Sequence, residues 1–341
     1  MRWATVVVAA VLALLAGACS SSGETQQSAV DLGPDSLALS VGASQSDFRA
    51  TIDVTLGGSD VTLLFDTGSV GLSVLSTAVP SDIASLTGEP FQEAFDGGVE
   101  LSGVIVSVPV TIAGQSTSGP IAIRLVQSAS CGSAAPDCPA SGGIDSFSAS
   151  IGADGILGAG LWSSGTVYSP LAQLGSGMPS SMAVYWDGDE GSVTFEPTLS
   201  STPVASLQMP AADPNVLPNG ADAWDNQTVS ICWQISSSPQ TCSETALDTG
   251  ASAMSFPIGF PGGPTSDVNQ FPSGQTITAA ASSGATPFLN FTTGSTLGTD
   301  LVTVIPGEPG VNSGLQFFNE FIVVFSLTDG QVQLYSPDQS D

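Results

Sequence analysis

The sequence contains no histidine and no lysine, and its three arginines stand against 31 acidic residues. Without histidine the chain cannot form a Ser-His-Asp or Cys-His nucleophile, or a zinc site with histidine ligands. Without lysine it can form neither a Schiff base nor the lysine contact of a phosphate-binding loop. Among the common catalytic side chains, carboxylates are therefore the main ones that remain.

The scarcity of positive charge also limits the partners of the chain. The formal net charge is −28, and the three cationic side chains are Arg2, Arg49 and Arg124. A surface of this kind repels phosphate backbones and anionic lipid headgroups. We therefore expect no nucleic-acid partner.

Helix-length periodicity is scarce as well. A short turn of helix near Ser169–Leu174 is the best candidate, whereas apolar runs of strand length recur between turn residues. Many short strands at this density predict an all-β fold of packed sheets or barrels. The expected strands are 49–56, 61–65, 104–112, 121–126, 182–185, 192–195, 228–235, 321–327 and 331–335.

The N-terminus has the features of an export signal. Arg2 precedes a short apolar run and then Cys19, which is typical of a signal peptide over residues 1–18 rather than of a mature membrane span. Residues 15–19 (Leu-Ala-Gly-Ala-Cys) resemble a bacterial lipobox, in which the cysteine is lipidated and becomes the new N-terminus. The alternative is an ordinary cleaved signal with an incidental cysteine. The lipidated cysteine and the Ser/Gly/Gln-rich stretch after it, residues 19–45, are expected to form a flexible tether.

Four cysteines remain once Cys19 is set aside, and they form two close pairs. An even number of cysteines in an exported chain favours disulfides, each closing a small loop. Zinc binding is the alternative, but both spacings are wider than the usual metal knuckle. The expected disulfides are Cys131–Cys138 and Cys232–Cys242, with no metal site.

The chain contains a loose internal duplication. Residues 64–69 (Leu-Phe-Asp-Thr-Gly-Ser) return as residues 246–251 (Ala-Leu-Asp-Thr-Gly-Ala). Each copy follows an apolar strand and leads into another apolar stretch, so two half-length β-lobes with equivalent turns are the simplest explanation. We expect an N-terminal lobe over residues 46–200 and a C-terminal lobe over residues 201–341.

The two Asp-Thr-Gly turns have the chemistry for amide hydrolysis. The apolar strands should place Asp66 and Asp248 at the floor between the lobes, where glycine lets the backbone approach closely. Two carboxylates about 3 Å apart cannot both ionise, so the pair shares one proton. The ionised member deprotonates a water and the protonated member hydrogen-bonds the scissile carbonyl, with neither role assigned to either residue. The supporting residues of the two turns are Thr67, Gly68, Ser69, Thr249 and Gly250.

At these motifs the chain resembles the pepsin-like aspartic proteases, over roughly residues 46–338. Residues 63–69 look like the first active-site motif of the family, and residues 246–250 look like the second. Residues 154–158 (Asp-Gly-Ile-Leu-Gly) are similar to the segment that threads behind the first catalytic Asp, and residues 314–325 have the spacing that precedes the final strands. The resemblance implies a bilobal fold of two β-barrel-like lobes, an extended peptide substrate in the cleft between them, and an acidic pH optimum.

The chain departs from the family pattern at the flap, the β-hairpin that closes over the substrate. The corresponding residues here are 95–103, with Phe95 at the position of the family's Tyr and with Gly97 and Gly98 in the turn. Phe95 keeps the apolar wall but lacks the hydroxyl. Ser73 stands where a Trp often supports that Tyr.

A second departure concerns the C-terminal lobe. Residues 312–314 (Asn-Ser-Gly) lack the two apolar residues of the family's second threading segment. Ala251 stands at the place that Ser69 has in the first motif, so the hydroxyl beside Asp66 has no match beside Asp248.

The sequence therefore predicts an aspartic endopeptidase without a cofactor or a metal, acting through Asp66 and Asp248. Its expected partners are a peptide or protein substrate and, through Cys19, the outer face of a membrane in the bacterial cell envelope; we expect a monomer. The alternative is a catalytically weak or inactive peptide- or protein-binding protein on the same scaffold, which the altered flap keeps open. A purely structural envelope lipoprotein would require both Asp-Thr-Gly turns to be coincidental.

Overall fold

The computed structural model describes residues 30–31, 36–44, 47–95, 97–133, 135–187, 190–199, 201–265, 270–294, 300–305 and 308–337. The expected signal peptide and the lipidation site Cys19 lie outside the described residues. Within them, no helix is both long enough and apolar enough to cross a bilayer.

Strands dominate the described chain, and each strand expected from the apolar runs is present. The expected helical turn is the 3-10 helix η1 (Pro170–Gln173). The structure adds α-helices that the periodicity did not predict. They are α1 (Ser81–Ala84), α2 (Ile144–Ile151) and α3 (Gly314–Glu320).

Most strands of the described chain belong to two sheets, one of 15 strands and one of seven. In order across the larger sheet, the strands are β17 (Ala205–Gln208), β28 (Gln331–Tyr335), β27 (Ile322–Ser326), β14 (Ser181–Asp187), β15 (Glu190–Phe195), β2 (Ser36–Ser44), β3 (Asp47–Leu56), β4 (Ser59–Asp66), β11 (Gly155–Ala159), β5 (Val70–Leu75), β10 (Ile121–Cys131), β7 (Val99–Val108) and β6 (Glu89–Ala94), with β8 (Val110–Ile112) and β9 (Gln115–Ser116) attached through β3. In the smaller sheet they are β24 (Leu289–Thr292), β23 (Thr276–Ala280), β20 (Val229–Ile235), β21 (Thr241–Ala246), β26 (Val311–Asn312), β22 (Met254–Pro257) and β25 (Val302–Ile305). Short two-stranded pairs join β1 (Val30–Asp31) to β16 (Thr198–Leu199), β12 (Ser163–Ser164) to β13 (Val167–Tyr168), and β18 (Ala211–Val216) to β19 (Asp222–Trp224).

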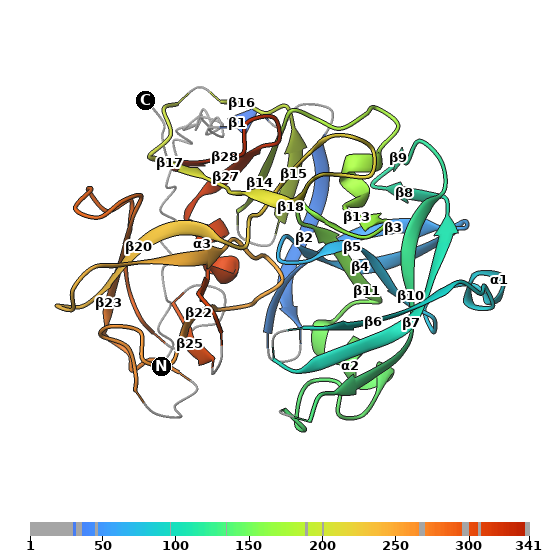
Figure 1. Cartoon of the computed structure of the whole chain (residues 1–341), viewed down its shortest axis with the longest axis horizontal. Coiled ribbons are helices and arrows are strands. Elements are labelled where there is room, and N and C mark those ends of the chain that lie inside the picture. The colour runs from blue at the N-terminus through green and yellow to red at the C-terminus, as the bar shows by residue number, and fades with distance from the viewer. Residues whose placement is uncertain are drawn as a thin grey trace, which may run out of the picture.

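The two sheets form two halves that stand side by side in Figure 1, with the seven-stranded sheet at the left and β6, β7 and β10 at the right. Strands β27 and β28, from the end of the chain, pair with strands of the first half through β14. The C-terminal strands therefore complete the larger sheet, which both parts of the sequence build together.

The expected tether is shorter than the sequence suggested. Residues 36–44, which we assigned to it, form strand β2, which pairs with β3 on one side and β15 on the other. Leu37, Leu39 and Val41 alternate with exposed residues and are buried in the core. This alternation is the period of a half-buried strand, so residues 36–44 belong to the sheet. Strand β1, which is also within the expected tether, pairs with β16.

The internal duplication is visible as a repeated arrangement of three strands. In the first half, β11 runs parallel to β4 and antiparallel to β5, which places it between the strands on either side of the first Asp-Thr-Gly turn. In the second half, β26 runs parallel to β21 and antiparallel to β22, on either side of the second turn. All residues of β5 and β11 are buried. Such continuous buried runs place the first turn deep in the molecule.

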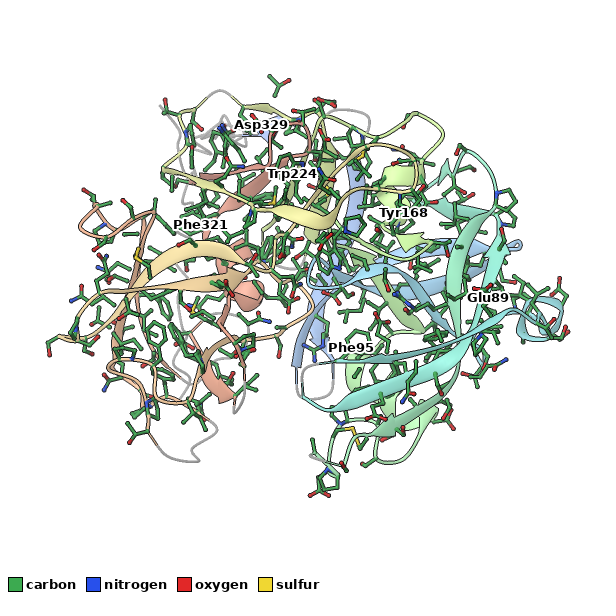
Figure 2. All side chains as sticks on the ribbon, viewed as in Figure 1. Glu89, Phe95, Tyr168, Trp224, Phe321 and Asp329 are labelled. Carbon is green, nitrogen blue, oxygen red and sulfur yellow. A yellow bond between two sulfur atoms is a disulfide. The ribbon has the colours of Figure 1, made fainter. Side chains whose placement is uncertain are left out.

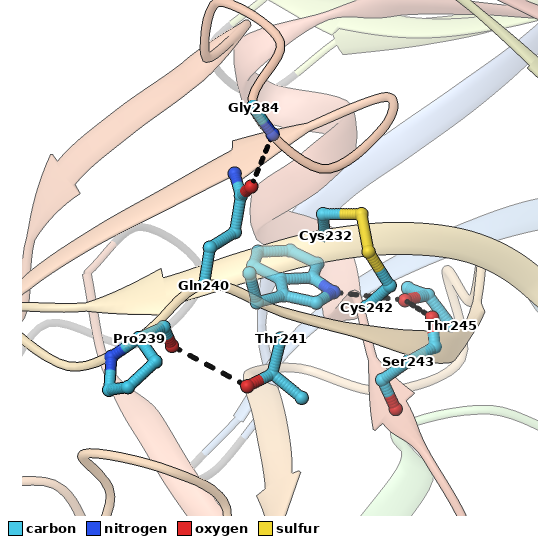
Figure 3. Close-up of a disulfide and its surroundings, with 9 residues drawn as sticks. Cys232, Pro239, Gln240, Thr241, Cys242, Ser243, Thr245 and Gly284 are labelled. Atoms are coloured by element: carbon cyan, nitrogen blue, oxygen red, sulfur yellow. Dashed lines mark hydrogen bonds between the residues drawn. A yellow bond between two sulfur atoms is a disulfide. The ribbon is translucent and has the colours of Figure 1, made fainter.

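Both expected disulfides are present, Cys131–Cys138 and Cys232–Cys242. Figure 3 shows the second one, which joins directly opposed residues of the β20–β21 hairpin. Next to it, the indole Nε1 of the fully buried Trp233 donates to Thr245 Oγ1 at 3.0 Å. The disulfide and this bond fix the strand that leads to the second Asp-Thr-Gly turn.

Candidate active site

Each expected catalytic aspartate lies at the end of a strand, directly after a buried apolar residue. Asp66 ends β4 directly after Leu63, Leu64 and Phe65, which are all buried. Asp248 comes after β21 and the buried Leu247. Asp66 is 6% exposed and Asp248 is half-buried. The strands thus carry two carboxyl groups into the interior, where a charge is unfavourable unless it is hydrogen-bonded.

The two threonines of the turns bond to the opposite turn in a reciprocal pattern. Thr67 Oγ1 donates to the carbonyl of Leu247 at 2.6 Å and accepts from the backbone N–H of Thr249 at 3.0 Å. Thr249 Oγ1 donates to the carbonyl of Phe65 at 2.8 Å and accepts from the backbone N–H of Thr67 at 2.9 Å. Four buried bonds therefore lock the two turns, and the halves that carry them, into a fixed register.

The glycines bring each carboxyl group against the opposite turn. A Cβ added to Gly68 would lie 2.3 Å from Asp248 Oδ1, and one added to Gly250 would lie 2.4 Å from Asp66 Oδ1. Both distances are shorter than any real carbon–oxygen contact, so no other residue fits at either position. The sequence prediction that Asp66 and Asp248 meet between the lobes agrees with this geometry.

Each carboxyl group accepts two hydrogen bonds from its surroundings. Asp66 accepts from the N–H of Gly68 at 2.7 Å and from the hydroxyl of Ser69 at 2.5 Å. Asp248 accepts from the N–H of Gly250 at 2.7 Å and from the side-chain amide of Asn312 at 2.6 Å. Ala251 supplies no hydroxyl to match that of Ser69, and the amide of Asn312 in β26 donates to Asp248 instead.

The environment raises the pKa of Asp66 well above its ordinary value. Burial is the main cause, because it penalises the charged form, and the negative charge of Asp248 acts in the same direction. The hydrogen bonds from Ser69 and Gly68 oppose the shift, whereas a hydrogen bond with Asp248 adds to it. A carboxyl group in this position retains a proton under conditions in which an exposed aspartate is ionised.

The two aspartates open into a cavity of about 510 Å³ between the halves. Its walls combine the two turns with the β6–β7 hairpin, from which Phe95 and Gly97 line the cavity. Figure 2 shows Phe95 at the end of this hairpin that faces the second half. Val99, next along the hairpin, is also part of the lining, and Gly98 abuts Ala135 instead. The hairpin that we expected as the flap thus borders the cavity.

A comparison with solved structures identifies the fold. The structure is similar to the crystal structure of the aspartic proteinase from Irpex lacteus, with a TM-score of 0.54 and 16% sequence identity. The match covers 89% of this chain and 98% of that chain. The chain has the pepsin-like aspartic proteinase fold. No protein-family model matches the sequence, and no curated protein matches it either.

Beneath the flap hairpin, the pepsin-like fold here contains a buried ion pair. Arg124 in β10 lies directly beside Ser73 in β5 and reaches Glu93 in β6, with 3.2 Å between Nη2 and Oε1. Its Nη1 also donates to the carbonyl of Val70 at 2.7 Å. The side chains of Arg124 and Glu93 are 4% and 24% exposed. An arginine–carboxylate pair thus links β6 to β10 beside Ser73, the position at which the family resemblance implies that a Trp often stands.

Several residues of this site were not found from the sequence. The side-chain amide of Asn226 donates to the carbonyls of Thr67 and Leu247, and that of Gln227 donates to the carbonyl of Gly68. No sequence pattern marks these two amides, because their partners are backbone atoms of distant segments. Asn312 could have been found from the sequence. Residues 312–314 correspond to the second threading segment of the family, but we considered only the apolar residues that this segment lacks.

No group of three or more histidine, cysteine, aspartate or glutamate side chains suited to a metal ion occurs in the part of the chain that the structure describes. Asp187 and Glu190 are paired at the end of the β14–β15 hairpin, and Glu190 is exposed.

Proposed function

We propose that the chain is an aspartic endopeptidase that hydrolyses peptide bonds through a water held between Asp66 and Asp248. The observation that supports this most strongly is the reciprocal geometry of the two turns. Each carboxyl group lies against the glycine of the opposite turn, and each threonine hydroxyl bonds to the opposite backbone. A structural role alone would not require two acids to approach each other in the interior, where like charges destabilise the fold.

The chemistry follows from the shared proton. One carboxylate takes a proton from the water while the water oxygen attacks the scissile carbonyl carbon. The other carboxyl group hydrogen-bonds the carbonyl oxygen and stabilises the charge that develops there. Collapse of the tetrahedral intermediate breaks the C–N bond as the departing nitrogen takes up a proton. The step needs no covalent enzyme intermediate, consistent with a chain that lacks histidine and lysine.

The cavity supports a peptide as the substrate. An extended peptide lying across the two aspartates would meet the flap hairpin on one side and β-strand backbone on the other, which offers both apolar contacts and hydrogen bonds. Phe95 and Trp162 supply apolar surface to the lining. We infer an extended peptide segment of a protein as the substrate.

Replacing each aspartate by asparagine tests the proposal. Asp66→Asn and Asp248→Asn should each lower kcat for a peptide library by at least about 10³-fold while the variants stay folded, because asparagine can neither accept nor supply the shared proton. Asp329→Asn, in the β27–β28 hairpin far from the cavity, is the matched control (Figure 2). Hydrolysis by the parent protein should also be blocked by pepstatin.

Two other results would contradict the proposal. Full activity in either Asp66→Asn or Asp248→Asn would show that groups outside this pair catalyse the hydrolysis. Binding of peptides or of pepstatin without any hydrolysis between pH 3 and 7 would instead establish the alternative, a peptide-binding protein on the proteinase scaffold.

We further propose that the protein is exported and anchored through Cys19. The two disulfides support export, because such bonds form in oxidising compartments. If Cys19 carries lipid, Cys19→Ser should move the protein from membrane to soluble fractions or stall its processing. Unchanged membrane association in that variant would contradict the anchor.

A further inference from the structure

Asn312 is held in a single orientation between two partners. Its Nδ2 amide donates to Asp248 Oδ2 at 2.6 Å. Its Oδ1 accepts from the backbone N–H of Gly314 at 2.9 Å, at the start of α3. Because the backbone N–H can only donate, the amide oxygen must face Gly314 and the NH₂ group must face the carboxylate. The amide cannot rotate to present its oxygen to Asp248 without losing both bonds.

The same segment also fixes the backbone of the second turn. The backbone N–H of Asp248 donates to Ser313 Oγ at 3.1 Å, and Ser313 is fully buried. Residues 312 and 313 therefore contact Asp248 at a carboxylate oxygen and at its backbone nitrogen. These contacts fix the side chain of Asn312 relative to the second Asp-Thr-Gly turn.

Asn312 and Ser69 donate to equivalent carboxylate atoms but differ in what else their side chains can do. Each donates to the Oδ2 atom of its aspartate, since Ser69 Oγ donates to Asp66 Oδ2. A hydroxyl can turn and accept a hydrogen bond from a protonated carboxyl group, whereas an NH₂ group can only donate. A protonated Oδ2 would face a donor at Asp248 but could face an acceptor at Asp66.

We propose that Asn312 is a positioning residue that keeps Asp248 the ionised member of the pair and leaves the shared proton on Asp66. This inference rests on the proposed endopeptidase function. The burial that raises the pKa of Asp66 acts in the same direction. The order of proton transfer, which the sequence left open, is then defined.

In this assignment Asp248 accepts the proton of the attacking water as the new C–O bond forms. Asp66 gives its proton to the carbonyl oxygen, so the tetrahedral intermediate carries two hydroxyl groups. When the C–N bond breaks, Asp248 returns its proton to the leaving nitrogen and Asp66 regains one from a hydroxyl group of the intermediate. Both carboxyl groups end in the state in which they began.

Other charged groups face the same cavity. They are Arg49, Glu93 and Glu308. Glu93 is paired with Arg124, and the Glu308 carboxylate accepts from Ser255 Oγ at 2.8 and 3.0 Å. None of these groups changes when Asn312 is replaced, so their field acts equally on the parent and on the variants.

The first test compares pH–rate profiles for peptide cleavage. Asn312→Ala should move the acidic limb of kcat/KM upward by about one pH unit, because one hydrogen bond to the ionised carboxylate is lost. It should lower kcat about tenfold and leave KM nearly unchanged. Asn219→Leu, which removes an exposed amide bonded to Ala172, is the control that should leave the profile in place.

A second substitution distinguishes the donor from a merely structural role. Ala251→Ser places a hydroxyl beside Asp248 at the position that corresponds to Ser69. In the Asn312→Ala background it should recover about half of the shift or more, because a hydroxyl also donates to the carboxylate. An Asn312→Ala profile that coincides with that of the parent, or one that Ala251→Ser does not move, would overturn the inference.

A measurement that does not depend on catalysis separates this inference from the proposed function. In an Asp66→Asn protein, the pH midpoint at which the Asp248 carboxyl carbon changes its ¹³C chemical shift should rise by about one unit upon Asn312→Ala. An unmoved midpoint overturns the role of Asn312 whether or not the protein cleaves peptides. A moved midpoint in a protein without hydrolytic activity supports the role of Asn312 and overturns the endopeptidase alone.

Discussion

The two Asp-Thr-Gly turns are alike where they touch each other and different where they touch their own halves. The four threonine bonds are reciprocal, and each aspartate accepts one bond from the glycine two positions on. The outer donor, however, is Ser69 within the first turn and Asn312 from another strand in the second. Duplication thus preserves the contacts between the copies, while the contacts within each copy are free to diverge.

The same contrast extends to the cores behind the turns. Val74 in β5 and Phe256 in β22 lie at the same distance along the chain from their aspartates, and both are fully buried. Phe256 contacts the rings of Trp233, Phe260 and Phe271, with centroids 5.0 to 5.5 Å apart. The second half therefore fills with aromatic rings a position that the first half fills with an aliphatic side chain.

The largest expected effect comes from breaking this aromatic cluster. Phe256→Ala should lower the free energy of unfolding by about 4 kcal/mol, and Val74→Ala by about 2 kcal/mol, because the larger side chain leaves the larger cavity. Urea unfolding followed by tryptophan fluorescence and by circular dichroism measures both values. Equal losses in the two variants would show that the second core collapses around the missing ring.

The two halves also differ in the polar interactions beneath the cavity walls, at two serines that lie at equivalent positions. Ser73 in the first half lies beside the Arg124–Glu93 ion pair, whereas Ser255 in the second half donates directly to Glu308. The ion pair links β6 to β10 across β7, and it contains one of the three arginines in the chain.

Removing Arg124 should therefore cost more than removing the serine hydroxyl. Arg124→Met leaves Glu93 unpaired and the carbonyl of Val70 without its donor, and should destabilise the protein by about 3 kcal/mol. Ser255→Ala should cost about 1 kcal/mol. Arg124→Met should also raise KM for peptides, because β6 loses its side-chain link to β10. Glu93→Gln, which can still accept from Arg124, should have a smaller effect on both stability and KM. A stable Arg124→Met variant with unchanged KM would contradict the anchoring role.

The threonine hydrogen bonds provide the opposite test. Here we expect a substitution in the first turn and the same substitution in the second turn to lower the free energy of unfolding equally. Thr67→Val and Thr249→Val should each lower the free energy of unfolding by about 2 kcal/mol, because each leaves a buried N–H unpaired and removes a donor from a buried carbonyl. The double variant should lose less than the sum, since the four bonds form one network. A difference of more than about 1 kcal/mol between the single variants would mean that one turn is held mainly by its own half.

Much of the site could be predicted from local sequence. Asp66, Asp248, the glycines and the threonines are recognisable because the turn itself dictates their types. Glycine stands where an added Cβ would lie within 2.4 Å of a carboxylate oxygen, and threonine stands where a hydroxyl must donate and accept. The cysteine pairs were predicted for a similar reason, since short loops leave few alternatives. Strand runs could be predicted from their apolar pattern.

What could not be predicted depends on segments that meet only in the fold. Asn312 lies 64 residues beyond Asp248 and reaches it because β26 runs beside β21. Glu93 and Arg124 meet because β6 and β10 flank β7. Strand β2 was assigned to the tether because the stretch that contains it is rich in Ser, Gly and Gln, yet Leu37, Leu39 and Val41 are buried in the core. Helices α2 and α3 are too short to show periodicity.

The smallest expected effect is a dependence of the free energy of unfolding on pH. It tests whether the two aspartates behave as one pair. Because burial and the charge of Asp248 raise the pKa of Asp66 in the folded state, the folded protein binds more protons than the unfolded chain above about pH 4. The stability that this proton provides is fully present below about pH 4 and is lost as the pH rises through the folded pKa. Above that range the two carboxylates repel each other and lower the free energy of unfolding.

Asp66→Asn removes this repulsion while keeping the shape of the side chain. The variant should therefore gain stability relative to the parent as the pH rises, by about 1 kcal/mol at pH 7, and the gain should vanish near pH 3. Asp248→Asn removes the same repulsion from the other half, so its stability difference should rise in parallel. Urea midpoints measured every half unit between pH 3 and 7 give both curves, with Asp82→Asn in helix α1 as the surface control. A flat difference curve for Asp66→Asn would show that the folded protein does not hold the proton there, and a rising curve for only one variant would show that the aspartates titrate as separate groups rather than as a pair.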